Sequence, residues 1–310
     1  MAEGSVPSLD EIVKVNTPLL ERRKRRLGKR VAPFGLVAPG AFWLAFFFLI
    51  PIGYMFVVSL NSGFVTTGFK FTWEWSNYTT GLTTYKTQYL RSLEYASIVT
   101  FLALVITYPV AYWIAFYGGK RKSTYLFLIL LPFFVSFIIR TIEWTFILAD
   151  NGIVLGPLKS LGLLPSNFHI LATPYAVIGG ITYNFLPFTA LPLYVALERI
   201  DASLIEAGKD LYANKVTTFL KVVWPLSLPG VFAAFLLTFI PAMGDFINAE
   251  LLGSPGTHMI GNIIMAQFGN TYYPLMSALS FVLMAALLVL ATVYARVLGT
   301  EDVTAGAAAG

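Results

Sequence analysis

The chain alternates between long apolar runs and shorter polar segments, and six of the apolar runs are long enough to cross a bilayer. A helix of about 20 apolar residues spans the hydrocarbon core. The runs lie at about 34–60, 93–117, 124–148, 174–197, 222–243 and 274–298. We therefore predict an all-α integral membrane protein with six transmembrane helices over 34–298. A basic tail at 1–33 precedes this domain, and a tail at 299–310 follows it.

Composition supports a membrane protein. The 310 residues are 57% hydrophobic and only 12% charged, and the mean hydropathy is +0.72. A soluble domain carries about 25% charged residues. There are no cysteines, which excludes disulfides and thiolate metal sites. The net charge of +5 does not indicate nucleic acid as a partner, because the basic residues cluster beside apolar runs.

The distribution of Lys and Arg predicts the orientation. Basic residues are frequent in the tail at 1–33, in "GGKRK" at 118–122, and in the segment after the fourth run. With six spans these three regions share one side, which the positive-inside rule makes cytoplasmic. Both termini are then cytoplasmic. The aromatic loop at 61–90 lies outside, where it either anchors at the membrane interface or docks an external partner.

The segment between the fourth and fifth runs has a different pattern. Over about 201–220 the apolar positions recur at helical spacing, while Glu206, Lys209 and Asp210 lie on the opposite face. Asp201 or Ser203 can cap the start. Prolines at 225 and 229 are expected to break the pattern where the next span begins. We predict a short amphipathic helix on the cytoplasmic side. Amphipathicity alone also fits a helix that lies on lipid headgroups.

The residues of this helix resemble a known signature. "EAGKDLYANKVTTFLKVVWPL", from Glu206, is similar to the coupling-helix motif of importer permeases in the ABC transporter superfamily. The matching or conservatively changed positions are Glu206, Ala207, Gly208, Asp210, Leu211 and Pro225. Tyr212 departs from the motif, because it stands where the family has Gly. Since Tyr tolerates a positive φ poorly, we expect the turn to move to Ala213–Asn214.

Two further stretches resemble spermidine/putrescine permeases. They are "LPFFVSFIIRTIEWTFILADNGIVLG" at 131–156 and "IPAMGDFINAELLGSPGTHMIGNII" at 240–264. The resemblance implies a bacterial inner-membrane importer of polyamines. It also implies a second permease subunit, two copies of a cytoplasmic ATPase and an extracytoplasmic solute-binding protein, with Glu206 at the ATPase contact. The chain has no G-x-x-x-x-G-K-[ST] phosphate loop, so ATP and Mg²⁺ are expected on the partner ATPase.

Polar groups within or beside the apolar runs are the candidates for the solute pathway, because such groups are costly in lipid. Carboxylates and aromatic faces suit a polycation. The candidates are Glu143, Trp144, Asp150, Tyr183, Asp245, Asn248 and Glu250. Arg140 and Glu143 are spaced to pair on one helix face. For Asp245 and Glu250, a solvated loop or a helix cap is an equally good interpretation. His169 and His258 have no second ligand at metal spacing.

Two other classes of function compete with the importer. A stand-alone channel or secondary transporter would explain six spans with buried charge, but no inverted repeat is visible. A membrane enzyme needs a catalytic constellation, and none is visible. Within the importer class, another small solute is the alternative to a polyamine.

Overall fold

The computed structural model describes residues 37–298, so the predicted tails at 1–33 and 299–310 lie outside the described residues. The chain divides into two compact units, with the boundary between Val58 and Ser59. The first unit contains all but the last residue of the apolar helix Val37–Ser59. None of the most apolar stretch of this helix is buried. The second unit holds every candidate site residue.

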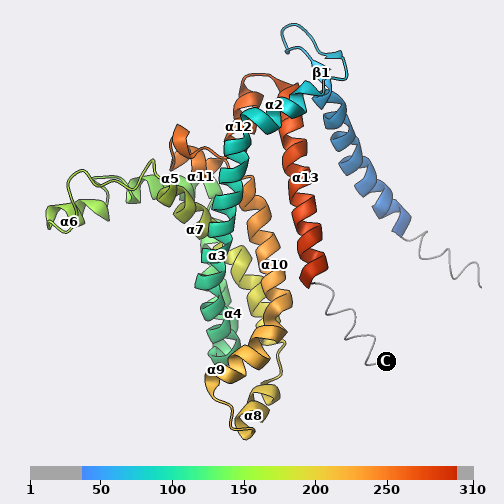
Figure 1. Cartoon of the computed structure of the whole chain (residues 1–310). Coiled ribbons are helices and arrows are strands. Elements are labelled where there is room, and N and C mark those ends of the chain that lie inside the picture. The colour runs from blue at the N-terminus through green and yellow to red at the C-terminus, as the bar shows by residue number, and fades with distance from the viewer. Residues whose placement is uncertain (1–36, 299–310) are drawn as a thin grey trace, which may run out of the picture. The chain divides into compact units, whose positions relative to one another are not determined.

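The second unit is a helical bundle (Figure 1). Its α-helices are α2 (Ser76–Thr84), α3 (Lys86–Tyr117), α4 (Lys122–Leu130), α5 (Phe137–Ile147), α6 (Leu155–Ser160), α7 (Pro174–Glu198), α8 (Ala202–Asp210), α9 (Lys215–Thr218), α10 (Trp224–Met243), α11 (Ile247–Leu251), α12 (Ile260–Gly269) and α13 (Tyr273–Leu298). Short 3-10 turns are η1 (Gly119–Arg121), η2 (Leu131–Phe134) and η4 (Pro255–Thr257), and η3 (Phe219–Val223) is a π-helix. A small antiparallel hairpin pairs β1 (Asn61–Ser62) with β2 (Lys70–Phe71).

Helices α3, α7 and α10 form the centre of the bundle. Their apolar side chains make two buried clusters, one around Val99, Ile181 and Phe239 and the other around Ile114, Leu193 and Ala234. Small residues let these helices approach closely, as is usual between membrane helices. The tightest approach involves Gly230 of α10, where an added Cβ would lie 2.3 Å from the Ala196 Cβ.

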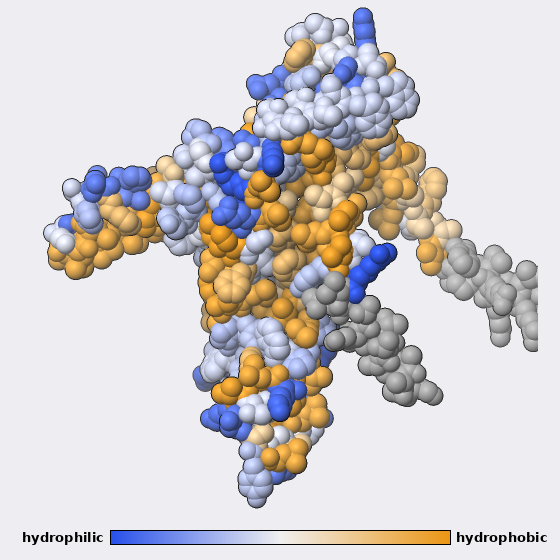
Figure 2. Space-filling model, viewed as in Figure 1, coloured by the Kyte–Doolittle hydropathy of each residue, from blue (hydrophilic) through white to orange (hydrophobic). Residues whose placement is uncertain are grey.

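Five helices have the length and composition to cross a membrane, and they confirm five of the predicted spans. They are Val37–Ser59, Lys86–Tyr117, Pro174–Glu198, Lys215–Met243 and Tyr273–Arg296. Figure 2 shows hydrophobic side chains over the middle of the bundle and polar ones gathered towards its ends. Helices α8 and α9 lie at one end, and α2 lies at the other with β1 (Figure 1).

The third predicted span, about 124–148, is not one straight helix. Two apolar stretches, Gly119–Phe134 and Phe137–Ile147, meet there at 86°. The backbone is extended at Val135 and Ser136, immediately after Pro132 and a 3-10 turn. Proline cannot donate the helical hydrogen bond, so the ladder ends there and a new helix starts. The pair is either a broken span or a re-entrant segment.

The prolines at 225 and 229 do not interrupt the helix where the fifth span begins, contrary to the sequence prediction. Helical structure runs without interruption from Lys215 to Met243. The π-helix η3 precedes Pro225, and the Trp224 N–H donates to the Phe219 carbonyl five residues back. This wider turn makes room for a residue that has no N–H and a bulky ring. Helix α9, the second part of the amphipathic segment, is therefore continuous with the span.

The close approach at Gly230 gives a test of the packing. We expect Gly230→Ala to lower the free energy of unfolding by about 1 to 3 kcal/mol, because Ala196 and the Pro192 carbonyl must move. Gly179→Ala in α7 is the matched control, since nothing lies within 4 Å of its added Cβ. The control should be neutral or stabilising by up to about 1 kcal/mol. Thermal unfolding of both variants in mild detergent measures the difference, and equal effects would contradict the packing.

Candidate functional site

Two regions carry the candidate residues, and the first is the hairpin formed by α8 and α9. Helix α8 starts where the sequence predicts, because the Asp201 carboxylate accepts a hydrogen bond from the Ser203 N–H at 2.9 Å. This bond also holds the pKa of Asp201 below its usual value. The Asn214 side chain caps α9 in the same way, by accepting from the Thr217 N–H at 2.7 Å. Two short helices replace the single helix predicted over 201–220.

The turn between the two helices lies at Tyr212 rather than at Ala213–Asn214. Tyr212 has a φ of 56°, whereas Asn214 is extended. The Tyr212 N–H donates to the Lys209 carbonyl at 2.9 Å, and the Ala213 N–H donates to the Gly208 carbonyl at 3.0 Å. These two bonds form a Schellman motif, which usually has Gly at the left-handed position. The Tyr212 side chain is 99% exposed, so no neighbour opposes the left-handed backbone.

The hairpin is attached firmly to the bundle. Ile205 of α8 and Phe219 of η3 pack against the buried cluster of α3, α7 and α10. The Phe219 ring meets the Tyr108 ring edge to face at 5.8 Å, and the Tyr108 hydroxyl lies 2.8 Å from the Ser227 hydroxyl. Within the hairpin, Gly208 lies against Thr218, where an added Cβ would be only 3.1 Å from the hydroxyl oxygen. Movement of the hairpin is therefore resisted by contacts on three helices.

The outer surface of the hairpin is exposed and mixed in character. Glu206, Ala207 and Asp210 are exposed on α8, while Gly208 is half-buried. Leu211 is 81% exposed beside Tyr212. Two large apolar side chains at the tip of a hairpin, flanked by charged groups, form the kind of patch that marks a protein contact. Pro225, predicted for the same site, lies instead in the first turn of α10.

The second region is a buried polar cluster, called here the Asn248 hub, formed by Thr141, Asn184, Asp245 and Asn248. The Asn248 amide oxygen accepts from the Thr141 hydroxyl at 3.1 Å and from the Asn184 amide at 3.0 Å. The Asn248 amide nitrogen donates to the Asp245 carboxylate at 2.9 Å, and so does the Asn248 backbone N–H. One side chain thus joins α5, α7 and α11 to the loop after α10.

Asp245 holds the start of α11 in place. It follows the end of α10, is only 7% exposed, and uses both carboxylate oxygens to accept hydrogen bonds from Asn248. Burial raises the pKa of Asp245 to about 6, although these hydrogen bonds favour the charged form. Its carboxylate is therefore occupied within the chain.

The aromatic candidates meet next to the hub. Trp144 of α5 and Tyr183 of α7 lie with ring centroids 5.3 Å apart, edge to face. Glu143 is exposed on α5. The predicted ion pair between Arg140 and Glu143 does not form, since Arg140 is buried while Glu143 points outward. Two Arg140 nitrogens, Nε and Nη1, have no acceptor in the part of the chain that the structure describes.

The other acidic candidates have partners at the surface. Asp150 pairs with Lys159 at 3.1 Å. Glu250 accepts from the Asn262 amide at 2.9 Å and lies 3.6 Å from the His258 ring. His169 is exposed in a loop. The described residues contain no group of three or more His, Cys, Asp or Glu side chains arranged to hold a metal ion.

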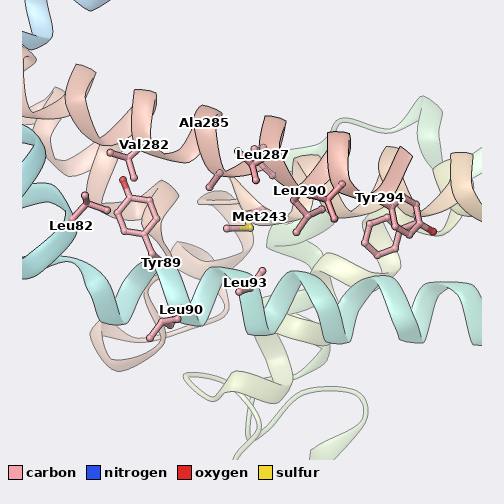
Figure 3. Close-up of a pocket in the computed structure, with 14 residues that line it drawn as sticks. Leu82, Tyr89, Leu90, Leu93, Met243, Val282, Ala285, Leu287, Leu290 and Tyr294 are labelled. Carbon is pink, nitrogen blue, oxygen red and sulfur yellow. The ribbon is translucent and has the colours of Figure 1, made fainter. Parts of the chain in front are cut away.

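A large apolar groove in the described bundle is unsuited to a charged solute. It is a groove of about 890 Å³ lined by α3, α10 and α13, with Leu82 of α2 at one end (Figure 3). Its lining is aliphatic and aromatic and includes no charged residue. The hydroxyl of Tyr89, one of the lining residues, already donates to the Leu279 carbonyl at 2.7 Å. A cation placed here would lose its hydration without gaining a partner.

Comparison with known proteins gives the family. A family model described as "binding-protein-dependent transport system inner membrane component" matches residues 107–299, more than half of the chain. The chain belongs to this family of ABC importer permeases. Residues 107–299 include α8, α9 and the Asn248 hub, so both regions described above lie within the family domain.

The permease has curated relatives over most of its length. It is 37% identical to the spermidine/putrescine transport system permease protein PotB of Haemophilus influenzae, over 82% of this chain and 90% of the relative. The PotB protein of Escherichia coli is 36% identical, over 82% and 93%. The Escherichia coli inner membrane ABC transporter permease protein YdcU is 35% identical, over 69% and 72%.

Solved structures agree on the fold. A chain of a bacterial ABC transporter that imports the acidic polysaccharide alginate superposes with a TM-score of 0.63 at 16% identity, covering 90% of this permease and 99% of that chain. A chain of the MetNI methionine ABC transporter superposes with a TM-score of 0.54 at 20% identity, covering 69% and 94%. At these identities the likeness concerns the fold alone.

Sequence reasoning did not include two members of the Asn248 hub among its candidates. Thr141 and Asn184 lie in apolar surroundings within α5 and α7. A polar side chain in an apolar span is a signal by itself, and Asn184 in "TYNFL" carries it. The contact between the two residues depends on the bend before α5, which the hydropathy pattern does not show.

The raised pKa of Asp245 predicts how stability depends on pH. The Asp245 carboxyl binds its proton more tightly in the folded state than in the unfolded state. Its contribution to the free energy of unfolding is therefore complete below about pH 4 and is lost as the pH rises through about 6. The loss is about 3 kcal/mol in the free energy of unfolding. We expect Asp245→Asn to remove this dependence. Thermal unfolding of both proteins from pH 4 to pH 7.5 measures it, and parallel pH profiles would contradict the prediction.

The left-handed residue at 212 predicts an unusual gain on substitution by Gly. We expect Tyr212→Gly to stabilise the end of α8 by about 0.5 to 1 kcal/mol, because Gly adopts this backbone without strain. Leu211→Gly is the control, since Leu211 has a φ of −84° and gains nothing. Hydrogen–deuterium exchange of the α8 amides should slow in the first variant and quicken in the second. Faster exchange in both would show that the Tyr212 side chain itself stabilises the turn.

Proposed function

We propose that this permease is one of two pore-forming subunits of an ATP-driven importer for polyamines such as spermidine and putrescine. The observation that carries the proposal is the hairpin of α8 and α9, which presents an exposed tip and is anchored to the bundle core. In this arrangement the hairpin faces the cytoplasm, both termini lie on that side, and two copies of a separate ATPase bind the two permeases. ATP and Mg²⁺ belong to the ATPase.

Three side chains would make the ATPase contact. Leu211 and Tyr212 supply apolar area at the tip, and Glu206 supplies a charge one to two turns earlier on the exposed face of α8. Closure of the ATPases would press on this tip. Because Ile205 and Phe219 are packed into the cluster of α3, α7 and α10, the push would reach the spanning helices.

A polyamine as the solute is supported by the likeness to PotB and by the chemistry near the Asn248 hub. Glu143 and Glu250 are exposed carboxylates, and the Trp144–Tyr183 pair offers aromatic faces to an ammonium group. We assign the solute-facing role to these residues. Asp245 and Asn248 have their polar atoms taken up inside the hub, so they position α11. Asp150 is paired with Lys159, so its charge is balanced and it has no solute-facing role in this proposal.

The binding protein would dock at the opposite end, by analogy with the alginate transporter, whose solved complex contains a periplasmic protein. This permease presents there the β-hairpin and α2, with exposed aromatic side chains at Phe71, Trp73 and Trp75. A permease for a different small solute is the second candidate, supported by YdcU, whose name states no solute. Membership of the permease family disfavours a stand-alone channel, a secondary transporter and a membrane enzyme.

The ATPase contact can be tested by co-purification from native membranes. We expect Glu206→Arg and Leu211→Glu each to reduce the recovered ATPase at least about tenfold, because each places a repelling or desolvated charge in the contact. Lys70→Glu on the β-hairpin is the control for an exposed charge reversal and should recover the ATPase normally. Full recovery with both hairpin variants would remove α8 from the contact.

The solute can be tested by uptake of radiolabelled spermidine and putrescine into cells that lack other polyamine importers. Cells with the complete transporter should accumulate one or both. Glu143→Gln combined with Glu250→Gln should lower uptake about tenfold while ATPase recovery stays normal, since only attraction for the cation is lost. An assembled transporter that takes up neither polyamine would refute the assignment of solute and favour the second candidate.

A further inference from the structure

A pocket lies between α11 and α12, and it is called here the Glu250 pocket. Its volume is about 430 Å³, which is within the range of small-ligand sites. Each of the two helices supplies residues at positions i, i+3 and i+4, which share one face of a helix. The residues are Ile247, Glu250 and Leu251 from α11, and Asn262, Met265 and Ala266 from α12. Helix α11 thus turns Asn248 into the hub and a different face into this pocket.

Glu250 is the one charged residue among the described residues that line the pocket, and its side chain is 62% exposed. Its Oε2 accepts from the Asn262 amide at 2.9 Å and lies 3.6 Å from the His258 ring nitrogen. Its Oε1 has no partner within the described residues 37–298. An imidazole balances a carboxylate only when it is protonated. The pocket therefore presents one carboxylate oxygen that can receive a donor from outside the chain.

Asn262 holds the pocket in shape. This residue is only 5% exposed. Its amide nitrogen donates to the Phe246 carbonyl at 3.0 Å and to the Glu250 carboxylate at 2.9 Å, while its amide oxygen accepts from the Met259 N–H at 3.0 Å. One buried side chain thus fixes the carboxylate together with the backbone of Phe246, whose ring also lines the pocket. A site held by bonds of this kind is arranged before its ligand arrives.

The chemistry of the lining selects the occupant. An accessible carboxylate attracts a cation, and the Phe246 ring, which is 37% exposed, offers an aromatic face to an ammonium group. The remaining lining is mainly apolar and suits methylene groups. Lipid chains would leave the carboxylate without a partner. A metal ion would find one carboxylate, whereas Mg²⁺ and Ca²⁺ need several oxygen ligands. A primary ammonium on a short alkyl chain meets all of these conditions.

We propose that the Glu250 pocket is a subsite for one aminoalkyl arm of the polyamine. In this subsite Glu250 Oε1 accepts from the terminal ammonium, the Phe246 ring lies against the same group, and Leu251 and Met265 contact the methylene chain. The inference rests on the proposed function, which makes a polyamine the solute. Asn262 is a positioning residue, because it acts through the carboxylate and the backbone that it holds.

Photolabelling of the purified, assembled transporter tests the subsite directly. The probe is a primary amine joined by a short alkyl chain to a diazirine, and the labelled peptides are identified by mass spectrometry. We expect labels within 246–251 and 262–266, and excess spermidine should abolish them. The same probe with its amine acetylated should label these peptides at least about tenfold less, because it carries no charge for the carboxylate.

Two variants separate the charge of the pocket from its volume. Glu250→Gln should lower labelling at least about tenfold, while its amide oxygen still accepts from Asn262, so thermal stability should stay at the wild-type value. Ala266→Phe fills the pocket and keeps the carboxylate, and it should lower labelling to the same extent. Ala285→Phe is the matched control, because it places the same ring in the apolar groove of Figure 3 and should leave labelling unchanged.

The contribution of the aromatic ring is smaller and can be measured separately. Phe246→Leu keeps an apolar side chain at the edge of the pocket but removes the aromatic face. We expect labelling to fall about threefold, as for a partly exposed cation–π contact. Unchanged labelling would remove the ring from the subsite.

The outcomes distinguish the subsite from the proposed function. Normal labelling of both Glu250→Gln and Ala266→Phe would overturn the subsite, and it would leave the proposed function intact if the wild-type transporter takes up polyamines. Loss of the second permease from the Glu250→Gln preparation would also overturn the subsite, because the carboxylate would then bind the partner chain. If the wild-type transporter takes up neither spermidine nor putrescine, the proposed function fails and the subsite fails with it.

Discussion

A polar group buried in this bundle must find its hydrogen-bond partner inside the protein, because the surrounding hydrocarbon offers none. The side-chain amide of Asn248 provides hydrogen-bond partners that link α5, α7 and α11. It accepts from Thr141 on α5 and from Asn184 on α7, and it donates to Asp245 beside its own helix α11. These bonds join α5, the helix that follows the bend after α4, to α7 and α11. The aromatic pair Trp144 and Tyr183, which we propose faces the solute, lies on the same two helices, α5 and α7.

The opposite end of the bundle is built on apolar contacts. Ile205 and Phe219 tie the hairpin of α8 and α9 to the cluster shared by α3, α7 and α10, and the π-helix before Pro225 keeps the hairpin continuous with the fifth span. Helices α7 and α10 run from this end to the neighbourhood of the Asn248 hub, and the Thr189 and Thr238 hydroxyls join them midway at 2.7 Å. A force applied at Leu211 and Tyr212 therefore has a packed path to the residues that would face the solute.

The sequence allowed the membrane class, five of the spans and the position of α8 to be predicted, because these follow from hydropathy, helical spacing and the Asp201 cap. It did not reveal the bend before α5, since apolar runs look alike whether the helix is straight or broken. The turn at Tyr212 was placed wrongly from propensity. A ring that is fully exposed meets no steric opposition, and two Schellman hydrogen bonds compensate for the backbone strain. Thr141 and Asn184 were not predicted because their contact depends on that bend.

The central claim is that α8 moves with the bundle as one body. The chain contains no cysteine, so spin labels can be introduced at single sites in an otherwise natural protein. Labels at Leu204 of α8 and Phe101 of α3 are both exposed. Their separation should be measured by double electron–electron resonance in the assembled transporter, without nucleotide and with ATP trapped. If α8 is rigidly attached to the bundle, the two labels give one narrow distance distribution that is the same in both states. A shifted or broadened distribution with ATP would contradict it, because the hairpin would then flex instead of transmitting the motion.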